Sequence, residues 1–175
     1  SARGGLGGAL THVREHDFGL ERMFSLGGAG RSVWETDYGA LDAGGTLKFL
    51  KKSFSASPSA GTQAAIDLGA IFRFSERYAA GLSILNFNRP KFVGGGRVDR
   101  APAAIKIGVS ETVRGLTLAL DLTKREPAGG HPGTANLAGG IERWWALRRL
   151  GSVAGRTGLS LGDRNKTWNW GLGWK

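Results

Sequence analysis

The feature that most constrains this chain is an alternation in which every second residue is apolar and the residues between are small or polar. It runs through four segments, residues 66–74, 105–109, 116–122 and 168–174. Successive side chains of a β-strand point to opposite faces, so each segment predicts a strand with one apolar face. The full pattern predicts strands at residues 3–14, 32–38, 40–52, 62–75, 77–88, 102–111, 114–125, 134–147, 151–160 and 166–175.

The predicted connections alternate in length. Residues 75–78, 111–115 and 147–151 form tight connections, whereas residues 53–61, 88–101, 126–134 and 161–166 form longer ones that hold or adjoin the five prolines. Short turns at one end and long loops at the other are typical of outer-membrane barrels, and occur less regularly in soluble meanders. The segment from Phe18 to Ala29 is left open as a strand, a short helix or a loop.

Composition excludes several classes of protein. Apolar residues make up 41% of the chain, too many for a disordered segment, and there is no cysteine for disulfides or thiolate sites. The formal net charge is +10, but the basic residues are scattered and form no recognisable nucleic-acid module. No run approaches the roughly 20 apolar residues of a membrane helix.

The direction of the apolar face separates two interpretations. In a soluble barrel or sandwich this face points inward, whereas in a membrane barrel it meets lipid around a polar lumen. The opposite face mixes small residues with sparse charges of both signs, which favours a lumen whose opposite charges pair across a narrow interior. The residues expected to line this lumen are Lys48, Asp67, Arg73, Lys106, Asp121 and Arg156.

Six tryptophans are many for this length, and several aromatic residues fall near predicted strand ends. Aromatic rings with a polar NH or OH concentrate at membrane interfaces, although they also fill soluble cores. The residues expected to form the interface belt are Tyr78, Trp144, Trp145, Trp168, Trp170 and Trp174.

Motifs for catalysis are weak. His12 to His16 spell H-x-x-E-H, a zinc signature that requires a helix, but glycines precede it, so a polar strand end is the favoured interpretation. Gly27 to Ser32 form a glycine-rich stretch without the lysine of a phosphate loop, interpreted as a flexible turn. Asp67 and Asp121 could act as paired carboxylates, but ion pairs with Arg73 or Lys106 are favoured. We therefore expect no enzyme activity, no metal and no cofactor.

The order of several segments resembles the PorV/PorQ-type outer-membrane barrels, which are related to the FadL transporters. The resemblance covers Gly39 to Lys175. Its main pieces are Ala65–Arg73 with Ala80–Pro90, Ala101–Val109, Leu118–Lys124, Asn136–Trp144 and Val153–Gly158, preceded by Gly45–Leu50. It implies an integral barrel of about fourteen strands in the full family fold, of which this chain supplies eight to ten, and it carries over no catalytic residue.

The sequence thus predicts an all-β fold, an antiparallel up-and-down transmembrane β-barrel or a large part of one. Residues 1–175 are interpreted as a single domain, with the alternative that strands are missing at both ends. The resemblance implies a place in the bacterial outer membrane and a role in type IX secretion or hydrophobic-compound uptake. Expected partners are outer-membrane lipid or lipopolysaccharide and proteins of a surface complex, not nucleic acid. The alternatives are a soluble barrel or sandwich binding a small apolar ligand, and a barrel subunit of a multi-chain assembly.

Overall fold

The computed structural model describes residues 3–15, 19–52, 61–94, 97–127, 132–147, 151–162 and 166–175. These residues form antiparallel strands joined in chain order, as the alternation predicted. The strands are β1 (Arg3–Glu15), β2 (Gly19–Thr36), β3 (Gly39–Lys52), β4 (Thr62–Arg73), β5 (Tyr78–Leu85), β6 (Lys91–Gly94), β7 (Arg97–Arg100), β8 (Ala104–Val113), β9 (Leu116–Arg125), β10 (Thr134–Leu147), β11 (Gly151–Gly162) and β12 (Lys166–Trp174).

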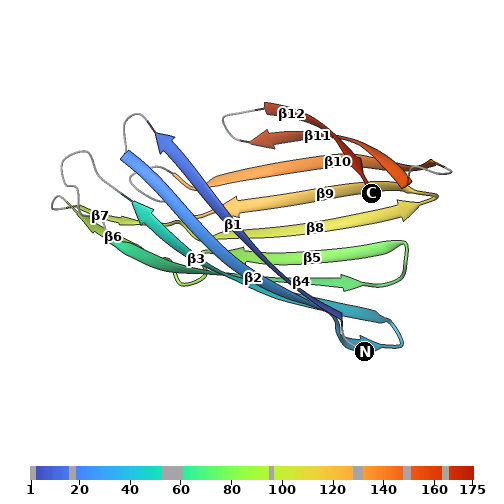
Figure 1. The fold of residues 1–175 in the computed structure, drawn as a ribbon, viewed down its shortest axis with the longest axis horizontal. Helices are drawn as coiled ribbons and strands as arrows, with labels where there is room; N and C mark the ends of the chain where they lie inside the picture. Colours follow the sequence, from blue (N-terminus) through green and yellow to red (C-terminus); the bar gives the residue numbers. More distant parts are fainter. Residues whose placement is uncertain are drawn as a thin grey trace.

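Ten of these strands make one curved sheet in the order β1-β2-β3-β4-β5-β8-β9-β10-β11-β12, and β6 pairs with β7 as a separate hairpin (Figure 1). The prediction of an all-β, antiparallel up-and-down fold is confirmed. Tight turns lie at Asp37–Tyr38, Phe74–Arg77 and Arg114–Gly115 at one end, here called the tight-turn end. The longer connections and the β6–β7 hairpin lie at the other, the long-loop end. Among the described residues no backbone pairing joins β1 to β12, so the sheet has two free edges.

The N-terminal part differs from the sequence prediction. Residues 19–29 of the segment left open belong to the 18-residue strand β2, and so does the stretch interpreted as a flexible turn, Gly27 to Ser32. Phe18 lies outside the described residues. The glycines serve close packing rather than flexibility, because a Cβ at Gly27 would lie 2.8 Å from Thr46 Oγ1 and one at Gly44 would lie 2.9 Å from the carbonyl oxygen of Gly28. The pairing of β2 with β3 shifts register between Gly30 and Trp34, which is a β-bulge.

The side chain of Asn88 takes the place of a neighbouring strand beside Ala64 and Ile66 on β4. β5 pairs with β4 only from Leu68 onward, and the chain then turns at Asn86, whose φ is 51°. Asn88 Oδ1 accepts the backbone N–H of Ile66 at 3.0 Å, and Asn88 Nδ2 donates to the carbonyl oxygen of Ala64 at 2.8 Å. These bonds satisfy the edge of β4 and fix the departure of the β6–β7 hairpin, which the sequence pattern placed within a connection.

The sheet encloses little core of its own. Among the described residues the buried apolar side chains are Ala65, Phe92, Ala103, Ala104 and Ala154. The accessible surface is 12807 Å², whereas a compact globular monomer of this mass exposes about 8,200 Å². The difference means that both faces of the sheet are largely uncovered. Within the described ranges, no helix has the length and apolar character needed to cross a membrane.

A substitution at Gly39 tests how much the tight turn between β2 and β3 depends on glycine. Its φ is 148°, and a Cβ there would lie 2.1 Å from the carbonyl oxygen of Arg73. We expect Gly39→Ala to lower the free energy of unfolding by about 1–3 kcal/mol in equilibrium urea unfolding, because an L side chain is strained at this φ. Gly7→Ala is the control, since a Cβ at that position would have no other atom within 4 Å. Equal losses in the two variants would contradict this account.

Candidate functional site

The strand register gathers the apolar residues onto one face across the whole sheet. Leu47 pairs with Leu26 on β2 and with Ile66 on β4, and Leu122 pairs with Ile107 on β8 and with Leu137 on β10. We call this side, which carries these residues and their alternating neighbours, the apolar face. The other side carries the intervening small and charged residues and is called the groove face. The predicted segregation into two faces is therefore present in three dimensions.

Large side chains of the apolar face are exposed along its full width. Leu47, Leu120 and Leu159, inside the sheet, are 41%, 49% and 48% exposed. At the free edges the values rise, to 90% for Leu6 on β1 and 77% for Leu172 on β12. A soluble monomer rarely shows a contiguous apolar surface of this extent, and such surfaces mark contact with a membrane or another protein.

Aromatic residues flank the aliphatic middle of the apolar face. At the tight-turn end the exposed aromatic side chains are Trp34, Tyr38, Phe74, Tyr78, Trp145 and Trp174. At the long-loop end Phe24 and Phe49 stack with ring centroids 6.4 Å apart, and Trp168 lies near the start of β12. Between them lie leucines and isoleucines. Trp34, Phe24 and Phe49 were not among the predicted interface residues. Trp34 and Phe24 lie on β2, whose path could not be deduced from the sequence, and Phe49 is the β3 partner of Phe24.

Two of the predicted interface aromatics take other positions. Trp144 lies on the groove face, where its Nε1 donates to Glu142 Oε1 at 2.7 Å. Adjacent residues of a strand face opposite sides, so Trp144 and Trp145 cannot share one face. Trp170 is on the apolar face but pairs with Thr157 in the middle of β11, away from either strand end. Tyr78, Trp145, Trp168 and Trp174 lie near strand ends on the apolar face, as expected.

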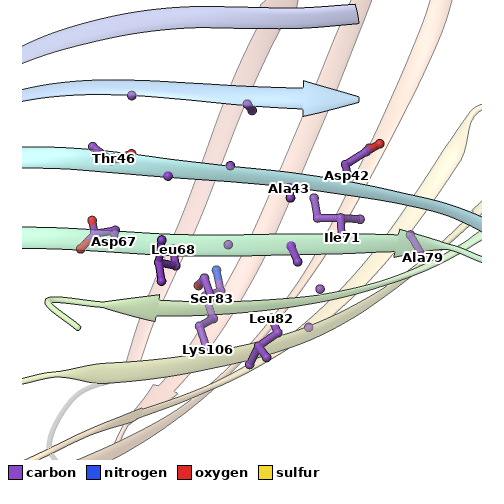
Figure 2. Close-up of a pocket in the computed structure, with 18 of the residues that line it drawn as sticks. Asp42, Ala43, Thr46, Asp67, Leu68, Ile71, Ala79, Leu82, Ser83 and Lys106 are labelled. Carbon is purple, nitrogen blue, oxygen red and sulfur yellow. The ribbon is translucent and has the colours of Figure 1, made fainter. Parts of the chain in front are cut away.

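The groove face forms a hollow of about 890 Å³. Its floor consists largely of glycine and alanine, and its polar residues come from β3, β4, β5, β8 and β9. Figure 2 shows those of β3, β4, β5 and β8, among them Asp42, Asp67 and Lys106. Small side chains leave room on the inside of the curved sheet. The polar side chains that line it are Asp42, Thr46, Asp67, Ser83, Lys106, Ser110 and Asp121.

The least exposed charge pair of the groove face joins β3 to β4. Lys48 Nζ lies 2.7 Å from Asp67 Oδ1, and these side chains are 12% and 18% exposed. Lys48 Nζ also donates to Asn86 Oδ1 at 2.7 Å, while the backbone N–H of Asn86 donates to Asp67 Oδ1 at 2.8 Å. The pair thus holds the turn that leads into the β6–β7 hairpin.

The other predicted lumen residues also lie on the groove face and form ion pairs. Lys106 Nζ is 3.1 Å from Asp121 Oδ2, as the sequence suggested, and Arg156 Nε is 3.3 Å from Glu142 Oε2. Arg73 pairs with Asp42 rather than with either predicted aspartate. Every one of these contacts links neighbouring strands, so the expectation of pairing across the interior is wrong: the register places each partner one strand away. Asp42 and Glu142 were missed, although Asp42 lies between the apolar residues Leu41 and Ala43.

The described residues contain no cluster of metal-ligating side chains. No group of three or more His, Cys, Asp or Glu side chains within those ranges could hold a metal ion. His12 to Glu15 lie in strand β1 rather than in the helix that the zinc signature requires, and His16 and His131 lie outside the described residues. Buried side-chain nitrogen and oxygen atoms of the described residues all have hydrogen-bond partners.

Comparisons with protein-family models, curated proteins and solved structures found no match to this chain. The resemblance to the PorV/PorQ-type barrels therefore stays a prediction, and the two faces of the sheet are the main guide to function.

The Lys48–Asp67 pair predicts a stability difference. Asp67→Asn should lower the free energy of unfolding by about 1–3 kcal/mol, because it leaves a shielded ammonium group without its carboxylate. The matched control is Asp121→Asn, whose ion pair is 45% and 35% exposed; its loss should cost less than about 1 kcal/mol. Urea unfolding of both variants measures the difference. Equal losses of unfolding free energy in the two variants would show that the groove face does not shield Asp67 from water.

A further ion pair, between Arg89 and Glu126, lies at the long-loop end. Arg89 Nε donates to Glu126 Oε2 at 2.8 Å, and this hydrogen bond lowers the pKa of Glu126. A folded-state pKa below the unfolded value means that the pair stabilises the fold above the ordinary glutamate pKa of about 4.3 and that this contribution is lost as pH falls through the lowered value.

We expect Arg89→Gln to return the pKa of Glu126 toward its ordinary value, as measured by carbon-detected NMR titration of the side-chain carboxyl. Lys91→Gln, a neighbouring change of the same charge in β6, should leave that pKa unchanged. An upward shift of equal size in both variants would assign the effect to general charge rather than to the Arg89 contact.

Proposed function

We propose that this protein is a β-barrel of the bacterial outer membrane, without enzymatic activity, that acts as an accessory in transport or protein secretion. The observation that carries the membrane part is the apolar face: an exposed aliphatic band with aromatic residues at both ends, on the side of the sheet opposite the groove. Lipid-facing bands between aromatic girdles are typical of outer-membrane barrels.

The dimensions support this proposal. A ten-residue strand such as β9 is about 34 Å long, and at a tilt of about 40° it spans about 26 Å, close to the ~25 Å apolar band of known barrels. The longer connections all leave one end of the sheet, as do the outer loops of such barrels, and the tight turns would lie on the periplasmic side.

The groove face supports a polar interior. In this proposal Lys48, Asp67, Lys106 and Asp121 border the lumen with their charges neutralised by their neighbours. The sheet closes when further backbone pairing satisfies its two edges, either between β1 and β12 or with strands of another chain. The resemblance to PorV/PorQ-type proteins supports the transport or secretion role, with cargo or hydrophobic compounds as the substrates.

The alternative is a soluble barrel that binds an apolar ligand. It requires the leucines of β9 to pack inward against each other or a ligand. Leu118, Leu120 and Leu122 are instead 42–49% exposed on the face opposite the groove, which favours lipid as their surroundings.

Spin labelling tests the direction of the apolar face in protein refolded into phospholipid vesicles. A nitroxide at Leu120→Cys should collide more often with oxygen than with a water-soluble nickel chelate, because it faces lipid. A nitroxide at Ser110→Cys, on the groove face, should collide with the nickel chelate more often, relative to oxygen, than the nitroxide at Leu120→Cys does. Refolding itself is scored by heat-modifiable gel mobility. A protein that stays in the aqueous phase, or a label at Leu120 with aqueous exposure, would overturn the proposal.

A further inference from the structure

Arg143 is a cation on the apolar face that forms no ion pair with another described residue. Its register partners, Leu116 on β9 and Gly155 on β11, both belong to that face, and its side chain is exposed. The neighbouring carboxylate, Glu142, lies on the groove face and pairs with Arg156. Among the described residues no carboxylate forms an ion pair with Arg143. Within the described ranges, the charge of Arg143 therefore has no acidic partner.

A second arginine at the tight-turn end, Arg77, has an acidic partner. Arg77 lies over the ring of Tyr78, with its Cζ 5.0 Å from the ring centroid, and its Nε donates to Glu111 Oε1 at 2.8 Å. Arg143 lies over the ring of Trp145 at 5.9 Å. Both arginines thus stack on an aromatic ring, but among the described residues only Arg77 has an acidic partner.

The surroundings of Arg143 combine this charge with apolar surface. Gly155 carries no side chain, and a Cβ there would meet Trp145 Cζ3 at 3.2 Å, so the indole ring leans over the glycine. On the other side of Gly155 lies Leu172, its register partner on β12, which is 77% exposed. One guanidinium, one indole ring and an adjacent aliphatic side chain therefore share a small area near the tight-turn end.

We propose that Arg143 and Trp145 bind the phosphate of an anionic phospholipid headgroup, with an acyl chain lying along Leu172. A planar guanidinium suits phosphate, and indole rings favour the headgroup level of a bilayer. The site rests on the proposed membrane function and lies in the leaflet at the tight-turn end. Arg77 does not bind lipid phosphate in this way, because Glu111 already occupies its donors.

The test measures which lipid lies next to Trp145. The protein is refolded into vesicles in which brominated phosphatidylglycerol or brominated phosphatidylcholine replaces part of the lipid, and the Trp145 contribution is the difference in quenching between wild type and Trp145→Phe. A basic residue near a membrane surface attracts anionic lipid by roughly 1 kcal/mol, so phosphatidylglycerol should be favoured about fivefold at this position.

Three variants decide the assignment. Arg143→Gln should reduce the preference to about unity, and Arg143→Lys should keep most of it. The charge-neutral control Arg77→Gln with Glu111→Gln should retain the wild-type preference. An unchanged preference in Arg143→Gln, or none in wild type, overturns the inference. Insertion is scored separately by heat-modifiable mobility: inserted protein without lipid preference overturns this site alone, whereas protein that does not insert overturns the proposed function as well.

Discussion

The in-register backbone ladder between antiparallel strands is the interaction on which the rest of the structure depends. With so few buried side chains, the sheet is held chiefly by hydrogen bonds from strand to strand, and each apolar residue meets another across the strand boundary, as Leu122 meets Ile107 and Leu137. The side-chain period is two, so a slip of one residue in any pair would move that strand's leucines to the groove face. The ladder therefore fixes the fold and the chemical character of both faces together.

The charges of the groove face are arranged by the same ladder. Lys48 with Asp67, and Lys106 with Asp121, are bound to partners on adjacent strands, and Lys48 also orders the turn at Asn86. Local neutralisation leaves the hollow free of large unbalanced charge while its glycines keep it open. On the apolar face, by contrast, Arg143 has no such neighbour among the described residues, since Glu142 belongs to the other side and pairs with Arg156. The alternation that separates apolar from polar residues also separates this cation from the nearest acid.

Apart from the β6–β7 hairpin, which fell within a predicted connection, the sequence predicted the strands from residue 40 onward. Their alternation is regular, and most of their connections contain glycine or proline. The sequence could not predict β2, where the bulge between Gly30 and Trp34 breaks the two-residue period. The partners of Arg73 and Asp67 also escaped prediction, since a choice among several aspartates depends on register, and register is a property of strand pairs. The opposite placement of Trp144 and Trp145, however, follows from their adjacency alone, and strand geometry was sufficient to predict it.

The two free edges set the strictest condition on the proposed membrane function. Unpaired backbone N–H and C=O groups cost several kcal/mol each in hydrocarbon, so an open sheet does not span a bilayer. β1 and β12 are the first and last of ten strands that alternate in direction, which makes their mutual pairing antiparallel. Their faces also correspond, with Leu6 and Leu10 on one edge, Trp168 and Leu172 on the other, and glycines between these residues on both strands. Closure through these edges would continue both the apolar band and the small-residue groove without a break, whether the pairing strand belongs to this chain or to another.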